Sequence, residues 1–126
     1  MSLDPYLAKG MLDWCLGGAA APTISGRWIQ WATGSPTTNA ASDGAFSSRR
    51  SVTFAPANSP QGSCTLSVAV TGATCSAAAT VRGWNLYDAS VGGNRLMYGT
   101  LTATLGCKSG SDAPAFGAGA LKITLV

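Results

Sequence analysis

The stretch GWNLYDASVGGNRLMYG, residues 83–99, carries the strongest structural signal in the chain. Two runs rich in aromatic and aliphatic residues flank the pair Gly92–Gly93, and glycine accepts the positive φ angles that a tight reversal needs. In the first run Trp84 and Leu86 fall on the same face of an extended strand. The stretch therefore predicts an antiparallel β-hairpin whose aromatic rings divide between a core and a second surface.

The sequence on both sides of this hairpin repeats the same short β patterns. Each run is bounded by clusters of Gly, Pro, Asn and Ser, which are typical of turns. About seven strands of this kind indicate an all-β fold, an antiparallel and jelly-roll-like β-sandwich that forms one domain over residues 1–126. The predicted strands cover residues 26–32, 49–55, 64–70, 80–88, 94–105 and 119–126, with an interruption at Gly99.

Only the N-terminal segment has the signature of an α-helix, predicted over residues 4–16. Asp4 is a good N-cap, Pro5 suits the first helical position, and Gly17–Gly18 ends the helix. The helix has two adjacent apolar strips, formed by Leu7, Met11 and Trp14 and by Leu12, Cys15 and Leu16. Two apolar strips cover more of the helix surface than contact with one sheet would bury. We therefore expect the helix to contact both its own domain and a further partner.

The strand predicted at residues 26–32 carries two tryptophans three positions apart. Because side chains alternate between the faces of a strand, Trp28 and Trp31 cannot both point into the core. The outward ring either packs on the helix or a neighbouring subunit, or forms a stacking platform for a ligand. Oligomer interfaces are rich in aromatic residues, which favours the first interpretation. We predict Trp31 and Tyr87 as contact residues.

The composition lacks the residue types that most catalytic sites use. The chain has neither His nor Glu, so a Ser-His-Asp or Cys-His site cannot be built within it. Its few Asp residues stand in helix-cap, helical or turn contexts, where they ordinarily serve the backbone. A zinc site would need all four cysteines from distant positions. We therefore predict no enzyme activity, catalytic residues, metal site or cofactor.

Charged residues make up only 10% of the chain, and the net charge is +3. The positive residues are scattered, apart from the adjacent Arg49–Arg50, whereas nucleic-acid binding needs a concentrated basic surface. No apolar run reaches the roughly 18 residues of a membrane-spanning helix, and the N-terminus lacks the basic region of a signal peptide. We expect neither a nucleic-acid nor a membrane partner. A surface so poor in charge favours burial against neighbours, as in an oligomer or larger assembly.

The four cysteines permit three pairings. Cys64 and Cys75 bracket one short predicted strand, so a disulfide between them is conceivable where the protein leaves the reducing cell. In a reducing compartment the cysteines would instead serve as small buried apolar residues.

Five pieces of the sequence, taken in order, resemble a family of small structural proteins of tailed bacteriophages that are often labelled tail fibre proteins. The pieces are MLDWCLGG, GRWIQWATGSP, AFSSRRSVTFA, GWNLYDASVGGNRLMYGTLT and GALKITLV. The family's strand motif is carried here by Phe46, Arg49 and Phe54. Its hairpin motif is carried by Gly83, Leu86, Tyr87, Asp88, Ala89, Gly92, Gly93 and Asn94, and departs from the family where Arg95 precedes Leu96.

This resemblance implies a non-enzymatic virion component that is assembled in the host cytoplasm. Fibres are long trimeric shafts, whereas this sequence predicts one sandwich. The leading hypothesis is therefore a capsid decoration (cement) protein bound in many copies, with the major capsid protein or other virion proteins as partners. A trimer is the favoured oligomer. The alternatives are a small tail fibre or baseplate component and a glycan-binding module on the virion surface.

The resemblance also suggests which residues make contacts in the virion. On the helix these are Leu7, Met11 and Trp14, and on the strand the pair Arg49–Arg50 would meet acidic groups of the shell. Release of a virion into an oxidising medium would allow Cys64 and Cys75 to cross-link.

Overall fold

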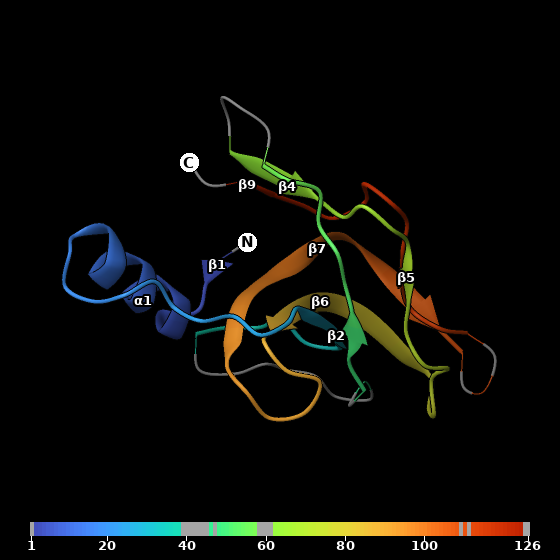
Figure 1. Cartoon of the computed structure of the whole chain (residues 1–126). Helices are drawn as coiled ribbons and strands as arrows, with labels where there is room; N and C mark the ends of the chain where they lie inside the picture. The colour runs from blue at the N-terminus through green and yellow to red at the C-terminus, as the bar shows by residue number, and fades with distance from the viewer. Residues whose placement is uncertain are drawn as a thin grey trace.

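The computed structural model describes residues 2–38, 46, 48–57, 62–108, 110 and 112–124, and its strands form two layers with one helix at the side (Figure 1). One layer is a five-stranded antiparallel sheet in the order β1-β7-β6-β2-β3. The other holds two short antiparallel ladders, β4 with β9 and β5 with β8. The five-stranded sheet consists of β1 (Ser2–Leu3), β2 (Trp28–Ala32), β3 (Arg50–Ser51), β6 (Ala79–Tyr87) and β7 (Arg95–Cys107). The ladders consist of β4 (Ser63–Thr65), β5 (Val70–Thr71), β8 (Ala115–Phe116) and β9 (Lys122–Thr124). These antiparallel layers confirm the predicted all-β class.

The predicted hairpin is the centre of the large sheet, where β6 pairs with β7. Gly92 and Gly93 have φ angles of 62° and 70°, as the reversal requires. Asp88 holds the loop closed, since its Oδ1 accepts from the Asn94 backbone N–H at 2.7 Å and its Oδ2 from the Asn94 side-chain amide at 3.1 Å. The hairpin is therefore fixed by its glycines and by one aspartate serving the turn.

The expected interruption at Gly99 is wrong, because β7 runs through this position without a break. A Cβ at Gly99 would lie 3.0 Å from the indole of Trp84 on the neighbouring strand. Gly83 lies on β6, beside Trp84, and is crowded in the same way. A Cβ there would lie 2.8 Å from the Gly99 carbonyl oxygen. These glycines allow close packing between adjacent strands rather than a break in either one.

Several outer strands are shorter than their patterns predicted. The run 49–55 forms β3 and a single bridge between Phe54 and Leu66. The run 64–70 divides into β4 and β5, because the chain leaves one ladder and joins the other. The Leu66 backbone N–H donates to Leu121 across that crossing, while the next residue bonds to a different neighbour. Residues 125–126 of the last predicted strand lie outside the described residues. The two-residue strands β1 and β8 carry too little alternation to be predicted.

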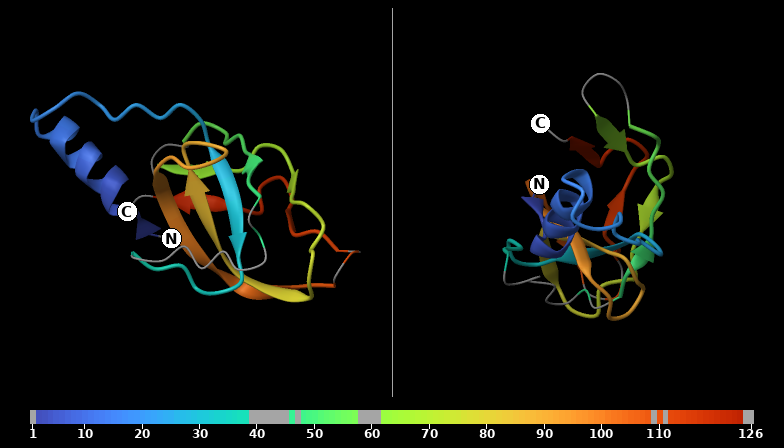
Figure 2. Two further views of the ribbon diagram at one scale, coloured as in Figure 1. Left: turned by 90° about the horizontal axis from the view of Figure 1, so that it is seen from below. Right: turned by 60° about the vertical axis from the view of Figure 1, so that its left-hand side comes forward.

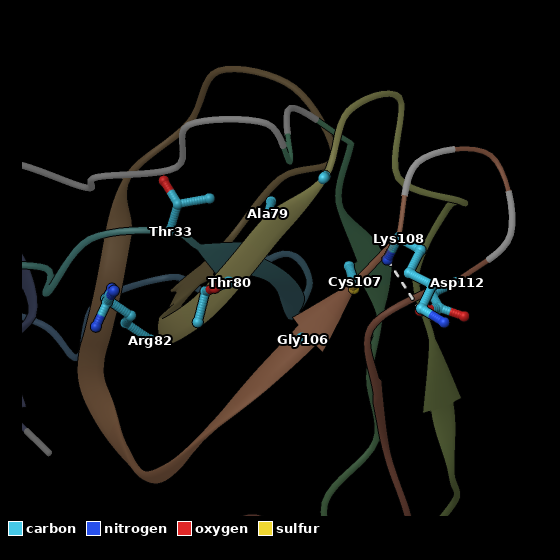
Figure 3. Close-up of a pocket in the computed structure, with 9 residues that line it drawn as sticks. Thr33, Ala79, Thr80, Arg82, Gly106, Cys107, Lys108 and Asp112 are labelled. Carbon is cyan, nitrogen blue, oxygen red and sulfur yellow. Dashed lines mark hydrogen bonds between the residues drawn. The ribbon is translucent and has the colours of Figure 1, made fainter.

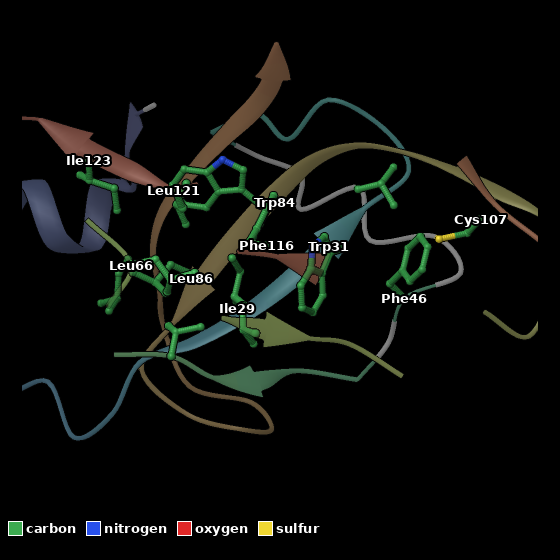
Figure 4. Packing of buried hydrophobic residues seen from close by; sticks show 14 of the residues in the cluster. Ile29, Trp31, Phe46, Leu66, Trp84, Leu86, Cys107, Phe116, Leu121 and Ile123 are labelled. Atoms are coloured by element: carbon green, nitrogen blue, oxygen red, sulfur yellow. The ribbon is translucent and has the colours of Figure 1, made fainter. Parts of the chain in front are cut away.

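The core lies between the two layers (Figure 4). Trp31 and Phe116 come from opposite layers, and their ring centroids are 5.8 Å apart. Ile29 and Leu86 add aliphatic surface from the large sheet. The ladder side of the core is formed by Leu66, Phe116, Leu121 and Ile123. The register that pairs Trp31 with Trp84 brings both tryptophans onto the inner face.

The helix α1 (Pro5–Cys15) stands at the side of the sheet rather than over it, and a long connection returns along it to β2 (Figure 2). Its bounds agree with the prediction. Asp4 is the N-cap and accepts from the Tyr6 backbone N–H at 3.2 Å, Leu16 is the C-cap, and Gly17 follows with a φ of 78°. The helix therefore begins and ends where its capping residues stand.

Candidate functional site

The start of α1 is attached to the sheet by a largely buried ion pair. The Nε of Arg95 donates to Asp4 Oδ2 at 2.8 Å, and the two side chains are only 9% and 15% exposed. The Asp4 backbone N–H also donates to the Leu96 carbonyl at 2.9 Å. Arg95 has further partners, among them Asn85 Oδ1 at 3.2 Å and the ring of Tyr98, whose centroid lies 4.3 Å from its guanidinium carbon. The first turn of α1 is thereby held in one position on β7.

Beyond this attachment, α1 presents apolar side chains to solvent. Of the six large apolar side chains that are exposed among the described residues, four belong to α1 or its C-cap. These four are Tyr6, Leu12, Trp14 and Leu16, with exposed fractions of 42%, 61%, 53% and 83%. The other two, Val68 and Val91, stand alone elsewhere on the chain. We call Tyr6, Leu12, Trp14 and Leu16 together the helix patch; at 3.6 residues per turn they are distributed around the exposed side of α1 rather than gathered on one narrow strip.

The structure separates the three helix residues that were predicted to make contacts. Leu7 is 3% exposed and belongs to the core, and Met11 packs against that core. Leu7 is therefore corrected to a core residue, and Met11 faces its own domain, whereas Trp14 is exposed. The sequence showed two apolar strips of equal quality, and the ion pair of Asp4 with Arg95 is what orients the helix on the sheet.

Trp31 does not make a surface contact, because it is 1% exposed and lies in the core. The two tryptophans of β2 do fall on opposite faces of the sheet, but Trp28 is the one that is only half-buried. Trp84 is also buried. Trp14 is therefore the one tryptophan of the four with most of its surface free, and the tryptophans do not form a shared stacking platform.

Arg49 and Tyr87 are both partly buried and contact each other. The guanidinium carbon of Arg49 lies 3.4 Å from the centroid of the Tyr87 ring. The Nη1 of Arg49 also donates to the carbonyl oxygens of Ala89 at 2.9 Å and Gly92 at 2.6 Å. Arg49 thus supports the hairpin loop, and the contact of Arg49 and of Tyr87 with a partner remains a prediction. Arg50 is exposed on β3, and its contact with a partner remains a prediction.

The cysteines differ from the predicted pairing. All four are free thiols, and Cys64 lies on β4 opposite Ile123. Cys75 instead lies near Cys107, because its backbone bonds to Gly110 and Asp112 in the turn that follows the end of β7. The pKa of Cys107 is raised from 9.0 to about 11, chiefly by burial and also by the neighbouring Cys75 and the Asp112 carboxylate. The bond between Cys64 and Cys75 is therefore not present in this structure.

An open pocket of about 810 Å³ lies beside these thiols (Figure 3). Its lining includes the cations Arg82 and Lys108 and the hydroxyls of Thr33 and Thr80. Its one carboxylate, Asp112, accepts from the Lys108 backbone N–H at 2.9 Å and so serves the turn. Among the described residues that line it, there is neither an aromatic ring nor a pair of acid–base groups.

The described residues form neither a metal-binding cluster nor a membrane-spanning helix. Among the described residues, no three His, Cys, Asp or Glu side chains gather in a way that could bind a metal ion. Over those same residues, no helix has both the length and the apolar character needed to cross a membrane. The helix patch is thus the most distinctive surface of the described residues.

Comparison with models of known protein families gives a match over nearly the whole chain. The family model described as podophage GP4 fiber I protein gp80 matches residues 2–124, which run from β1 to β9. A comparison with curated proteins found no match. The family match confirms the resemblance to small structural proteins of tailed phages that the sequence motifs indicated. It also agrees with the expected place of the chain in a virion.

Proposed function

We propose that this chain, which belongs to the family of the podophage GP4 fiber I protein gp80, is a non-enzymatic structural component of a phage fibre. The family description favours the tail-fibre alternative over the capsid decoration protein that the sequence analysis placed first. The chain attaches to a neighbouring virion protein through the helix patch. The observation that carries this proposal is the concentration of exposed apolar side chains on α1.

The way α1 is held supports an attachment role. Its first turn is fixed by the ion pair of Asp4 with Arg95, while the exposed residues Leu12, Trp14 and Leu16 lie toward its far end. A helix held in this way presents its apolar side chains without first having to fold or dock, which lowers the entropic cost of binding. Full burial of each large apolar side chain contributes about 1.5–3 kcal/mol, so one patch gives a modest contact that several copies in an assembly strengthen.

A capsid decoration protein is the second candidate, and the scarcity of charge favours it. Charged residues make up 10% of the chain, and a surface of this kind suits extended burial against a shell. The helix patch would then meet the major capsid protein. The same attachment chemistry serves both candidates, so they differ in where the protein sits in the virion. For either candidate, the trimer expected from the sequence stays a prediction.

Glycan binding has less support than either. Such a module would use aromatic rings as stacking platforms, but Trp31 and Trp84 are buried and Tyr87 is covered by Arg49. The pocket beside Arg82 offers cations and hydroxyls without a ring. A sugar could still meet it through polar contacts, and this alternative stays a prediction.

The experiment that tests the proposal is complementation of a phage from which the gene has been deleted. A variant with Leu12→Ser and Trp14→Ser changes only exposed side chains, so its free energy of unfolding should stay within about 0.5 kcal/mol per substitution of the original. We expect at least a tenfold loss of copies per virion, measured by quantitative mass spectrometry of purified particles. The matched control is Val68→Ser with Val91→Ser, which removes equally exposed apolar side chains away from α1 and should leave incorporation unchanged.

Immunogold labelling of the same particles separates the two candidates. Label confined to the tail region supports the fibre component, whereas label spread over the head supports the decoration protein and overturns the fibre proposal. Normal incorporation of the Leu12→Ser, Trp14→Ser variant would show that attachment does not depend on the helix patch, wherever the label is found.

A further inference from the structure

Cys75 and Cys107 form a pair of buried thiols that the proposed function does not use. Their exposed fractions are 2% and 6%, and both belong to the same core cluster. Cys107 ends β7, and Cys75 lies in the connection between β5 and β6. The Cys75 thiol lies close enough to Cys107 to raise the pKa of the Cys107 thiol.

The backbone holds this pair together independently of the sulfur atoms. The Cys75 backbone N–H donates to the Asp112 carbonyl at 2.9 Å, and the Cys75 carbonyl accepts from the Gly110 N–H at 2.8 Å. That segment is the turn that directly follows Cys107. The turn is closed in its own right, because Lys108 N–H donates to Asp112 Oδ2 and the Asp112 N–H donates to the Lys108 carbonyl at 3.3 Å. Cys75 is thus bonded to the segment that begins at Cys107.

A small oxidant has a route to this pair. Cys107 lines the open pocket beside Lys108 and Asp112, so one of the two residues borders solvent even though its side chain is largely buried. A virion component leaves the reducing cell at lysis, and disulfides persist in the oxidising medium outside. The pair therefore meets oxidising conditions after the protein has folded.

We propose that Cys75 and Cys107 form an intrachain disulfide when the protein meets a small-molecule disulfide outside the cell. One cysteine thiolate attacks a sulfur of the oxidant, forming a mixed disulfide and releasing one thiolate. The second cysteine, as its thiolate, attacks the cysteine sulfur of that mixed disulfide and releases the other half of the oxidant. The protein loses two electrons and two protons, and the oxidant gains both and becomes two thiols.

The disulfide would stabilise the folded protein after folding is complete. It closes a loop of about 30 residues that contains β6 and nearly all of β7, and a crosslink of this length restricts the unfolded chain strongly. Burial keeps the pKa of Cys107 high, and only the thiolate reacts, so exchange with a disulfide is slower at neutral pH than at pH 9. Folding in the cytoplasm therefore precedes the crosslink.

The test uses the full chain and a variant with Cys15→Ser and Cys64→Ser, which leaves only the proposed pair. Cys15 is exposed and Cys64 is partly exposed, so these changes leave the core intact. Each protein is incubated with glutathione disulfide at pH 9, alkylated under denaturing conditions and weighed. We expect the variant to lose about 2 Da and both alkylatable thiols. Its melting temperature should rise by about 10 °C and fall back when a reductant is added.

Tryptic mapping of the full chain provides a second measurement. Cleavage at Arg82 and Arg95 separates Cys75 from Cys107, whereas Cys64 and Cys75 share the peptide 51–82. Fragmentation of the linked pair by tandem mass spectrometry then assigns the bond to Cys75 rather than Cys64. Free thiols at both Cys75 and Cys107 after oxidation, stable glutathione adducts at either of these cysteines, or a disulfide joining Cys64 to Cys75 within the peptide 51–82 would each overturn the proposal. A melting temperature that does not change on oxidation would show that the disulfide does not stabilise the fold.

Discussion

Replacing Asp4 with asparagine removes the charge that attaches α1 to the sheet but keeps a side-chain oxygen that can cap the helix. A hydrogen bond to a charged group contributes about 1.5–3 kcal/mol to the free energy of unfolding. Leaving a buried arginine wholly unpaired would cost about 3–5 kcal/mol. Arg95 retains Asn85 and the ring of Tyr98, so we expect Asp4→Asn to cost about 2 kcal/mol. Asp4→Ala also loses the cap, which adds about 1 kcal/mol.

Urea unfolding followed by circular dichroism measures these differences. With a slope typical of small domains, a loss of 2 kcal/mol lowers the midpoint by about 1 M urea. The matched control is Asp13→Asn, which makes the same chemical change on the same helix. Asp13 pairs with Lys9 at the surface, where the side chains are 40% and 79% exposed, and such pairs contribute less than about 0.5 kcal/mol.

The comparison of Asp4→Asn with Asp13→Asn decides the reasoning. If both variants unfold at the same urea concentration, the ion pair of Asp4 with Arg95 does not stabilise the fold, and the argument that it fixes the position of α1 fails. If Asp4→Ala and Asp4→Asn unfold at the same urea concentration, the side chain at position 4 does not stabilise the fold as a helix cap.

Two further predictions concern the large sheet. Gly83→Ala places a Cβ against the backbone of β7 and should lower the free energy of unfolding by about 1–3 kcal/mol. Gly106→Ala adds a Cβ that meets no atom within 4 Å, so it should be neutral or slightly stabilising. Equal melting temperatures for the two variants would contradict the packing argument. Because the pKa of Cys107 is raised in the folded state from 9.0 to about 11, the fold favours the protonated thiol. Its contribution is complete below pH 9 and is lost as the pH rises from 9 to 11. Under reducing conditions Cys107→Ala should therefore lose less stability over that range than the original protein, and parallel pH curves would show that this thiol contributes nothing.

The local features of the fold followed from the sequence because local chemistry decides them. The hairpin at residues 83–99 depends on Gly92 and Gly93, and the helix bounds depend on Asp4 and on Gly17–Gly18. These residues act on their neighbours in the chain, so their effect can be read without knowing the rest of the structure. The absence of His and Glu excluded most acid–base catalysis in the same direct way.

The family resemblance came from ordered motifs rather than from any one residue. Of the residues that carry it, Asp88 and Gly92–Gly93 close the hairpin loop, and Arg49, which directly precedes β3, supports that loop. The motif thus describes one structural unit, which explains why its pieces occur together. It indicated a virion protein but not the surface through which such a protein attaches.

The sequence alone thus determined the strand-rich class, the hairpin, the helix and its caps, while the tertiary structure decided which side of each element faces the core. Periodicity showed that Trp28 and Trp31 lie on opposite faces of β2, but only the second layer made Trp31 the buried one. Likewise, the partner of Cys75 is Cys107 rather than Cys64, because the turn after β7 folds back beside it. The physical reason is the same in both cases. Alternation along a chain is a local property, whereas burial depends on segments that are distant in sequence and meet only in the folded protein.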